Sequence, residues 1–157
     1  MRKPAILITG ANGEMGHGLI TALHKKNNVN IVALDLNQLD VSISMYANEE
    51  HIGNILDQGL IEQLNDKYEF DTIYHLAALL STRAEFSPQA AHDVNVGGTL
   101  NLLNLAIEQG RSQGNTVKFF FPSSIAIYGL ANLETKNDAC PIKEDSYQNP
   151  TTMYGCN

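Results

Sequence analysis

The feature that most constrains this chain is an apolar segment that runs directly into a glycine-rich turn. Residues 5–9 are mostly apolar, Gly10, Gly13 and Gly16 follow, and a helical pattern then begins. Glycine lets a backbone turn sharply and approach a pyrophosphate closely. The helix behind the turn offers unpaired N–H groups and the positive end of its dipole to the same anion. The pattern predicts a strand, a phosphate-binding turn and a helix over residues 14–26, with a ligand-free tight turn as the alternative.

Strand-like and helix-like segments alternate along the rest of the chain. We expect strands at residues 29–34, 51–52, 72–76 and 117–121, helices at residues 58–67 and 88–109, and a loop or short helix at residues 79–86. This alternation predicts a doubly wound α/β fold, a parallel sheet with helices on both faces. Placing the ligand site where the strand order reverses gives the expected order 3-2-1-4-5. Residues 1–157 form one domain in this interpretation.

Glycines and aromatic residues add detail to the second half. The helix at residues 88–109 should end at Gly110, because glycine is favoured just past a helix C-terminus. Gly97 and Gly98 lie in its middle, where glycine lowers helix stability, so we expect a close approach to a neighbouring backbone there. Three successive phenylalanines at residues 119–121 are typical of a buried central strand.

Asp35 follows the second expected strand, 19 residues after Gly16. That spacing suits the carboxylate that binds the adenosine ribose hydroxyls of a dinucleotide. A carboxylate at this point would repel a 2′-phosphate, so the sequence favours NAD over NADP. A solvated aspartate in a loop is the alternative.

Composition excludes several classes of partner. The net charge is −7 and no basic run occurs, which argues against binding to nucleic acid or to an anionic membrane surface. No apolar stretch approaches the ~18 residues of a membrane span, and the N-terminus carries no signal-peptide pattern. Cys140 and Cys156 lack metal-ligand spacing, so we expect free thiols, no metal site and a cytoplasmic protein.

Several motifs, in order, resemble the extended short-chain dehydrogenases/reductases, the NAD-dependent epimerase/dehydratase family with a Rossmann-type fold. They lie at residues 9–16, 35, 53–55, 75–78, 95–99, 123–129 and 150–155. The resemblance implies NAD as the cofactor, bound by Gly10, Asn12, Gly13, Glu14, Met15, Gly16, Asp35, Asn54, Ile55, Leu76, Ala77, Ala78, Asn95 and Pro122. The family often has Asp where Asn54 stands, but an amide carbonyl can also accept from the adenine amino group.

The same resemblance implies two catalytic residues, Ser124 and Tyr154. Oxidation of a carbinol carbon requires removal of the hydroxyl proton, and Tyr154 would be the base while Ser124 hydrogen-bonds the substrate oxygen. The family has a lysine four residues after the tyrosine, which would be position 158, past Asn157. We therefore expect an N-terminal fragment of a longer enzyme, without the C-terminal substrate domain. The short helix after Pro150 should leave Tyr154 poorly fixed.

The implied substrate is a small molecule, and Ser81 and Thr82 lie where it could bind. The first interpretation is an epimerase or dehydratase acting on a nucleotide sugar. Residues 79–81 also resemble threonine dehydrogenases of this fold, which makes a dehydrogenase of a hydroxy-amino acid the second. A non-catalytic NAD-binding protein is the third. We expect His75 to have a packing or capping role, and the chain to self-associate as a homo-oligomer.

Overall fold

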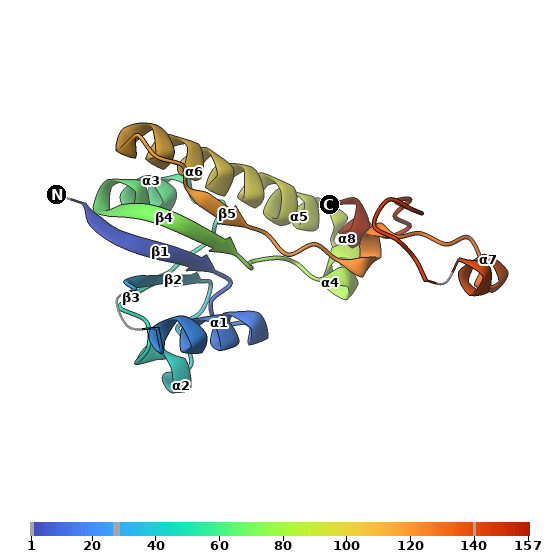
Figure 1. Cartoon of the computed structure of the whole chain (residues 1–157), viewed down its shortest axis with the longest axis horizontal. Helices are drawn as coiled ribbons and strands as arrows, with labels where there is room; N and C mark the ends of the chain where they lie inside the picture. The colour runs from blue at the N-terminus through green and yellow to red at the C-terminus, as the bar shows by residue number, and fades with distance from the viewer. Residues whose placement is uncertain (1, 27–28, 140) are drawn as a thin grey trace.

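The structure, a computed structural model, describes residues 2–26, 29–139 and 141–157, arranged around one parallel sheet (Figure 1). Cys140 lies outside the described residues. The strands are β1 (Lys3–Thr9), β2 (Ile31–Asp35), β3 (Glu49–Ile52), β4 (Tyr68–His75) and β5 (Lys118–Phe120). Every pair is parallel and the order is β3-β2-β1-β4-β5. The predicted fold class and strand order are confirmed.

Helices cover both faces of this sheet. They are α1 (Glu14–His24), α2 (Val41–Ser44), α3 (Gln58–Lys67), α4 (Ser81–Phe86), α5 (Pro88–His92), the π-helix η1 (Asp93–Gly98), α6 (Thr99–Gln113), the 3-10 helix η2 (Ile125–Ile127), α7 (Leu133–Asp138) and α8 (Met153–Cys156). Figure 1 shows α3 and α6 on one face and α1 and α2 on the other. The segment that carries α7 projects away from the sheet.

Alternate side chains of β1 pack into two separate hydrophobic cores. Leu7 is buried with Leu64 and Leu102, which belong to α3 and α6. Ile8 is buried on the opposite face with Ile20 of α1 and Ile43 of α2. Because both faces are covered, the central strands consist of nearly continuous apolar residues.

The amino edge of the sheet is stabilised by charge. Glu49, at the start of β3, accepts hydrogen bonds from Lys67, from Tyr68 (2.5 Å) and from Lys3 (2.9 Å). These hydrogen bonds lower the pKa of Glu49 to about 2, and that from Lys67 contributes most to the shift. The cluster joins the first residues of three strands, on the side of the sheet away from the glycine-rich turn.

The helix predicted at residues 88–109 is three segments in succession, α5, η1 and α6, and it continues past Gly110. It ends at Gly114, whose φ of +65° favours glycine. A Cβ at Gly110 would lie 2.8 Å from the Asn115 carbonyl oxygen, so that glycine makes room for the returning chain. Gly98 also lies at a close approach, but its neighbour is the Ile55 side chain and not a backbone. The predicted end of the helix was wrong because both Gly110 and Gly114 follow the apolar residues of the helix, and the chain stays helical past the first of them.

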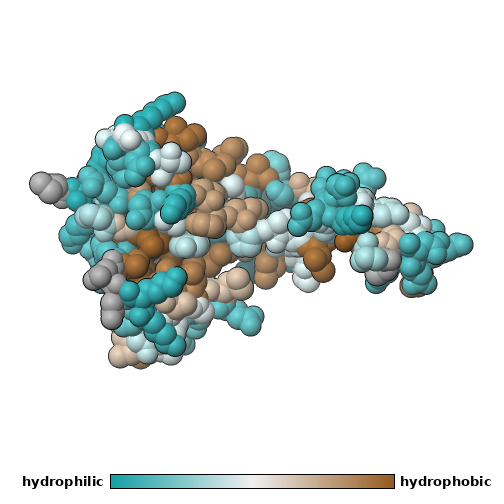
Figure 2. All heavy atoms as spheres, viewed as in Figure 1, coloured by the Kyte–Doolittle hydropathy of each residue, from teal (hydrophilic) through white to brown (hydrophobic). Residues whose placement is uncertain are grey.

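The expectation of a buried central strand at residues 119–121 is also wrong in this structure. Strand β5 pairs only with β4, at the edge of the sheet, and Phe120 and Phe121 are 49% and 50% exposed. Phe120 stacks on Tyr74 with ring centroids 4.9 Å apart. Figure 2 shows apolar surface in the middle of the molecule, where Figure 1 places β5 and α6. An apolar run identifies a strand, but the number of its neighbours depends on residues elsewhere.

Gly16 and Gly18 form a matched pair for testing how closely α1 packs. A Cβ at Gly16 would collide with the Ala11 carbonyl, whereas a Cβ at Gly18 has no neighbour within 4 Å. We expect Gly16→Ala to lower the free energy of unfolding by about 1–3 kcal/mol. Gly18→Ala should raise it by about 0.5–1 kcal/mol through helix propensity. Urea unfolding followed by circular dichroism measures both, and equal effects would contradict this account of the turn.

Candidate dinucleotide-binding site

A groove of about 450 Å³ follows the carboxyl edge of the sheet. Its walls come from the turn after β1, the end of β2, the segment after β3, and the loop after β4 together with α4. Of the predicted cofactor residues, all line it except Asn12, Asn95 and Pro122. The topology therefore brings together side chains that the sequence separates by up to about half the chain.

The turn after β1 can pack against the loop after β4 only if residue 10 is glycine. Gly10 has a φ of +65°, and a Cβ there would lie 2.6 Å from the Ala77 nitrogen in the loop after β4. Gly13 is the N-cap of α1 and provides no side-chain cap, whereas Asp40 and Asp57 cap α2 and α3. The first N–H groups of α1 therefore have no side-chain acceptor, and they lie at the groove, where an anion can accept from them.

Asp35 stands at the end of β2 with a fixed carboxylate. Its two oxygens accept from the backbone N–H groups of Asn12 (2.9 Å) and Asn37 (3.1 Å). Each carboxylate oxygen keeps further lone-pair capacity for ligand hydroxyls. The Asn12 side chain points elsewhere: it donates to Gln38 O (3.2 Å) and accepts from Asp40 N (2.9 Å). Asn12 thus positions the segment after β2 and does not line the groove.

Asn95 and Pro122 also differ from their predicted place. Asn95 is buried behind the loop after β4, where its side chain accepts from Leu79 N (2.8 Å) and donates to Leu79 O (3.0 Å). It fixes the shape of the groove wall without lining it. Pro122 is exposed after β5 and outside the groove.

His75 lies at the centre of a fully assigned hydrogen-bond network. Thr99 donates its hydroxyl to Asn95 O (2.5 Å), so His75 Nε2 must be the donor in its 2.9 Å contact with Thr99 Oγ1. Nδ1 then accepts from the Thr9 hydroxyl at 2.8 Å. Burial lowers the pKa of His75 to about 4, which agrees with this neutral form. His75 packs and orients, as predicted, and joins β1, β4 and α6 below the groove.

The segments that carry Ser124 and Tyr154 lie together. Gly155 packs so tightly on the Ala126 carbonyl that a Cβ would collide with it. Ser124 Oγ accepts from Ala126 N at 3.2 Å, and Glu85 of α4 accepts from Met153 N at 2.6 Å. Helix α8 is therefore held on both sides through Met153 and Gly155, while the expectation that Tyr154 itself is poorly fixed stays a prediction. Neither Ser124 nor Tyr154 lines the groove.

Sequence reasoning missed Arg83, which lines the groove from α4. Ser81 and Thr82, the predicted substrate residues, are exposed at the start of α4 and do not line it. Leu80, the extended N-cap residue of α4, and Arg83 within the helix both line it. The sequence offers no signal for this role, because the direction of Arg83 depends on the rotation of α4, which the buried Ala84 sets.

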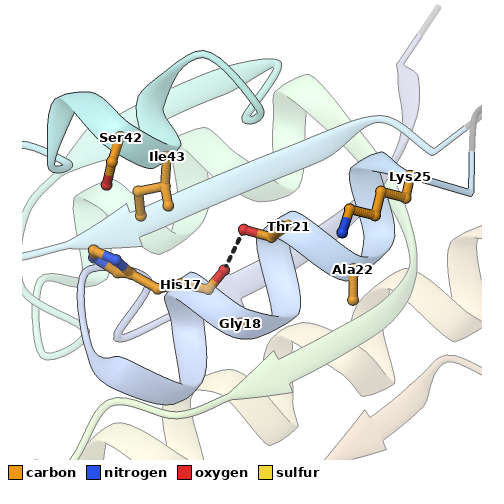
Figure 3. Close-up of a pocket in the computed structure, with 7 residues that line it drawn as sticks. All are labelled: His17, Gly18, Thr21, Ala22, Lys25, Ser42 and Ile43. Carbon is orange, nitrogen blue, oxygen red and sulfur yellow. Dashed lines mark hydrogen bonds between the residues drawn. The ribbon is translucent and has the colours of Figure 1, made fainter.

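A second, shallower depression lies between α1 and α2 (Figure 3). It has a volume of about 620 Å³ and is lined by His17, Gly18, Thr21, Ala22, Lys25, Ser42 and Ile43. None of the predicted site residues is among them. Within the described ranges, no cluster of His, Cys, Asp or Glu could hold a metal ion, and no helix is long and apolar enough to cross a membrane.

Comparison with known proteins agrees with this geometry. Residues 7–157 match the profile of the GDP-mannose 4,6 dehydratase family. A Staphylococcus saprophyticus protein described as an uncharacterized epimerase/dehydratase is 33% identical over 153 residues, covering 97% of this chain and 44% of that protein. The chain thus spans less than half the length of this curated relative.

Two solved structures resemble the chain over nearly its whole length. L-threonine dehydrogenase from Clostridium difficile has a TM-score of 0.77 at 32% identity, covering 99% of this chain and 46% of that one. A UDP-glucose 4-epimerase has a TM-score of 0.79 at 26% identity, covering 96% and 43%.

The buried histidine generates a pH prediction. Its pKa is lowered from 6.5 to about 4, so between these values the unfolded chain binds a proton that the folded chain does not. Stability should fall as the pH falls through this window, by about 2 kcal/mol between pH 7 and pH 5. Urea unfolding at both pH values should show this loss in the unaltered chain and a clearly smaller loss in His75→Gln, where the pKa of His51, also lowered by burial, still contributes in the same direction. The exposed His24→Gln control should retain it, and an unchanged pH dependence in His75→Gln would contradict the assignment.

Proposed function

Because the chain belongs to the NAD-dependent epimerase/dehydratase family of extended short-chain dehydrogenases/reductases, we propose that it forms the NAD-binding half of an oxidoreductase. One observation carries the proposal: a single groove joins the uncapped glycine turn, Asp35 and the loop after β4. In this fold a dinucleotide lies across the carboxyl edge at the point where the strand order reverses. That point is here the turn after β1.

The residues fit NAD from one end of the groove to the other. Asp35 would accept from the adenosine ribose hydroxyls, and the Asn54 carbonyl would accept from the adenine amino group. The N–H groups at the start of α1 would donate to the pyrophosphate. Ala77 and Ala78 leave room beyond the glycine turn for the nicotinamide half. When bound, NAD would accept a hydride from the substrate carbon.

Tyr154 and Ser124 are the proposed catalytic residues. Tyr154 would remove the substrate hydroxyl proton and Ser124 would hydrogen-bond the same oxygen. Support comes from the docking of Gly155 on Ala126, which brings the two segments side by side at the end of β5.

The proposed substrate is a nucleotide sugar, because the matching family profile and the Staphylococcus relative are described as dehydratases or epimerases. A second candidate is a hydroxy-amino acid such as L-threonine. It is favoured by the higher identity to the threonine dehydrogenase, 32%, than to the UDP-glucose epimerase, 26%.

Self-association is also part of the proposal. Leu100, Leu103 and Ile107 lie along α6 at helical spacing and are 55%, 36% and 49% exposed. An apolar stripe of this kind is typical of a surface that associates with another chain.

Turnover tests the function and separates the candidates. The full-length protein should convert one of UDP-glucose, GDP-mannose or L-threonine. Epimerisation or dehydration of a nucleotide sugar returns the hydride and leaves NAD unchanged overall, so the sugar product is detected directly, whereas oxidation of L-threonine accumulates NADH. Tyr154→Phe should lower turnover at least ~100-fold, since general base catalysis contributes about that much. NAD binding should be unchanged in this variant. Tight NAD binding without turnover of any substrate would favour a non-catalytic NAD-binding protein.

Asp35 should set the choice between NAD and NADP. Asp35→Ala removes the carboxylate that would repel a 2′-phosphate, so it should weaken NAD binding and reduce the preference for NAD over NADP. Asp71→Ala, an exposed aspartate of β4 outside the groove, makes the same charge change and should leave both unchanged. Calorimetric titration with each dinucleotide measures the ratio. Tighter binding of NADP than of NAD by the unaltered chain would overturn the assignment.

A further inference from the structure

Arg83 is the only basic residue among the described residues that line the groove. The next residue, Ala84, is completely buried and fixes the rotation of α4. Within the described part of the chain, the Arg83 guanidinium has no hydrogen bond or ion pair. The ion pairs found there join Lys3 and Lys67 to Glu49 and do not involve Arg83. A charged fork with five N–H donors thus stands at the groove without a protein acceptor.

The remaining charges of the groove are unfavourable for a dinucleotide. Glu14 and Asp35 both line it, and the whole chain carries a net charge of −7. Glu14 opens α1, at the same helix end that would bind the pyrophosphate. The Glu14 carboxylate would repel an anion bound at that helix end, and a nearby cation would offset the repulsion.

The position of Arg83 in the groove indicates which part of the dinucleotide it would contact. Asp35 and Asn54 mark the adenosine end of the groove, and the glycine turn lies between them and the loop after β4. The strand order β3-β2-β1-β4 places Arg83 of α4 on the other side of the glycine turn from Asp35 and Asn54. A guanidinium gains nothing beside the nicotinamide ring, which carries a positive charge when oxidised. The pyrophosphate is the anionic group of NAD, so it is the group that a guanidinium in this groove would bind.

We propose that Arg83 binds the pyrophosphate of the dinucleotide and compensates for Glu14, which makes α4 part of the cofactor site. This inference rests on the proposed NAD-binding function. A planar guanidinium pairs with phosphate oxygens through two parallel N–H donors, which a lysine ammonium does not reproduce. The α1 N–H groups and the Arg83 fork thus contact the same phosphates from the β1 side and the β4 side.

Calorimetric titration with NAD and with ADP-ribose tests the proposal. Arg83→Gln should weaken both ligands by the same factor, roughly tenfold, because both contain the pyrophosphate. Arg83→Lys should lose less, since it keeps the charge. Arg111→Gln is the matched control: it makes the same charge change on an exposed residue in the last turn of α6 and should alter neither affinity. Unfolding of each variant without ligand confirms that the fold is intact.

The salt dependence of NAD binding and the Glu14→Gln variant provide a second, independent test of the proposal. The NAD affinity of the unaltered chain should fall as NaCl rises, and Arg83→Gln should reduce that dependence, because the lost contact is electrostatic. Glu14→Gln should tighten NAD binding a few-fold, and less so when combined with Arg83→Gln, if the two side chains act on the same phosphates.

The alternatives give different patterns. Unchanged NAD and ADP-ribose affinity in Arg83→Gln would overturn the inference. Weakening of NAD alone would overturn it in favour of a contact with the nicotinamide half. If the unaltered chain binds neither ligand, the proposed function fails and the inference fails with it. Normal binding in the unaltered chain with no effect of Arg83 refutes the inference alone.

Discussion

The close contact between Gly10 and the backbone of Ala77 holds the carboxyl edge of the sheet together. It sets the turn after β1 directly against the loop after β4, and any side chain at position 10 would push them apart. Beneath this contact, His75 joins Thr9 to Thr99, so the same two strands are also tied through side chains. The shape of the groove depends on this approach, since two of its walls, the turn after β1 and the loop after β4, meet there.

The two edges of the sheet are stabilised by different chemistry. At the amino edge, Glu49 is surrounded by ammonium groups and a phenol, and its pKa is lowered to about 2. At the carboxyl edge, the His75 network is neutral and each proton has an acceptor. Buried neutral hydrogen bonds fix an edge without filling it with charge. The charged groups of the groove, Asp35 and Arg83 among them, therefore remain accessible to a ligand.

Much of the fold and most of the groove could be predicted because the signals are local. Glycine spacing, an acidic residue at a strand end and strand–helix alternation each depend on a short window, and together they place Gly10 and Asp35 on one edge. The roles of Asn12 and Asn95 could not be predicted, because each binds backbone atoms of a segment more than ten residues away. Arg83 could not be predicted either, because the direction of its side chain depends on how α4 is rotated, and the burial of Ala84 in the folded chain sets that rotation. Which strand lies at the edge likewise depends on pairing between distant segments.

Helix α4 carries two functional contacts on six residues. Arg83 faces the groove, and Glu85 accepts from the first N–H of the helix that bears Tyr154. A rigid helix of this length cannot shift at one contact without shifting at the other. In the proposed function, a ligand that moves Arg83 would therefore also move the start of α8, so one short helix connects the dinucleotide groove to the segment that carries Tyr154.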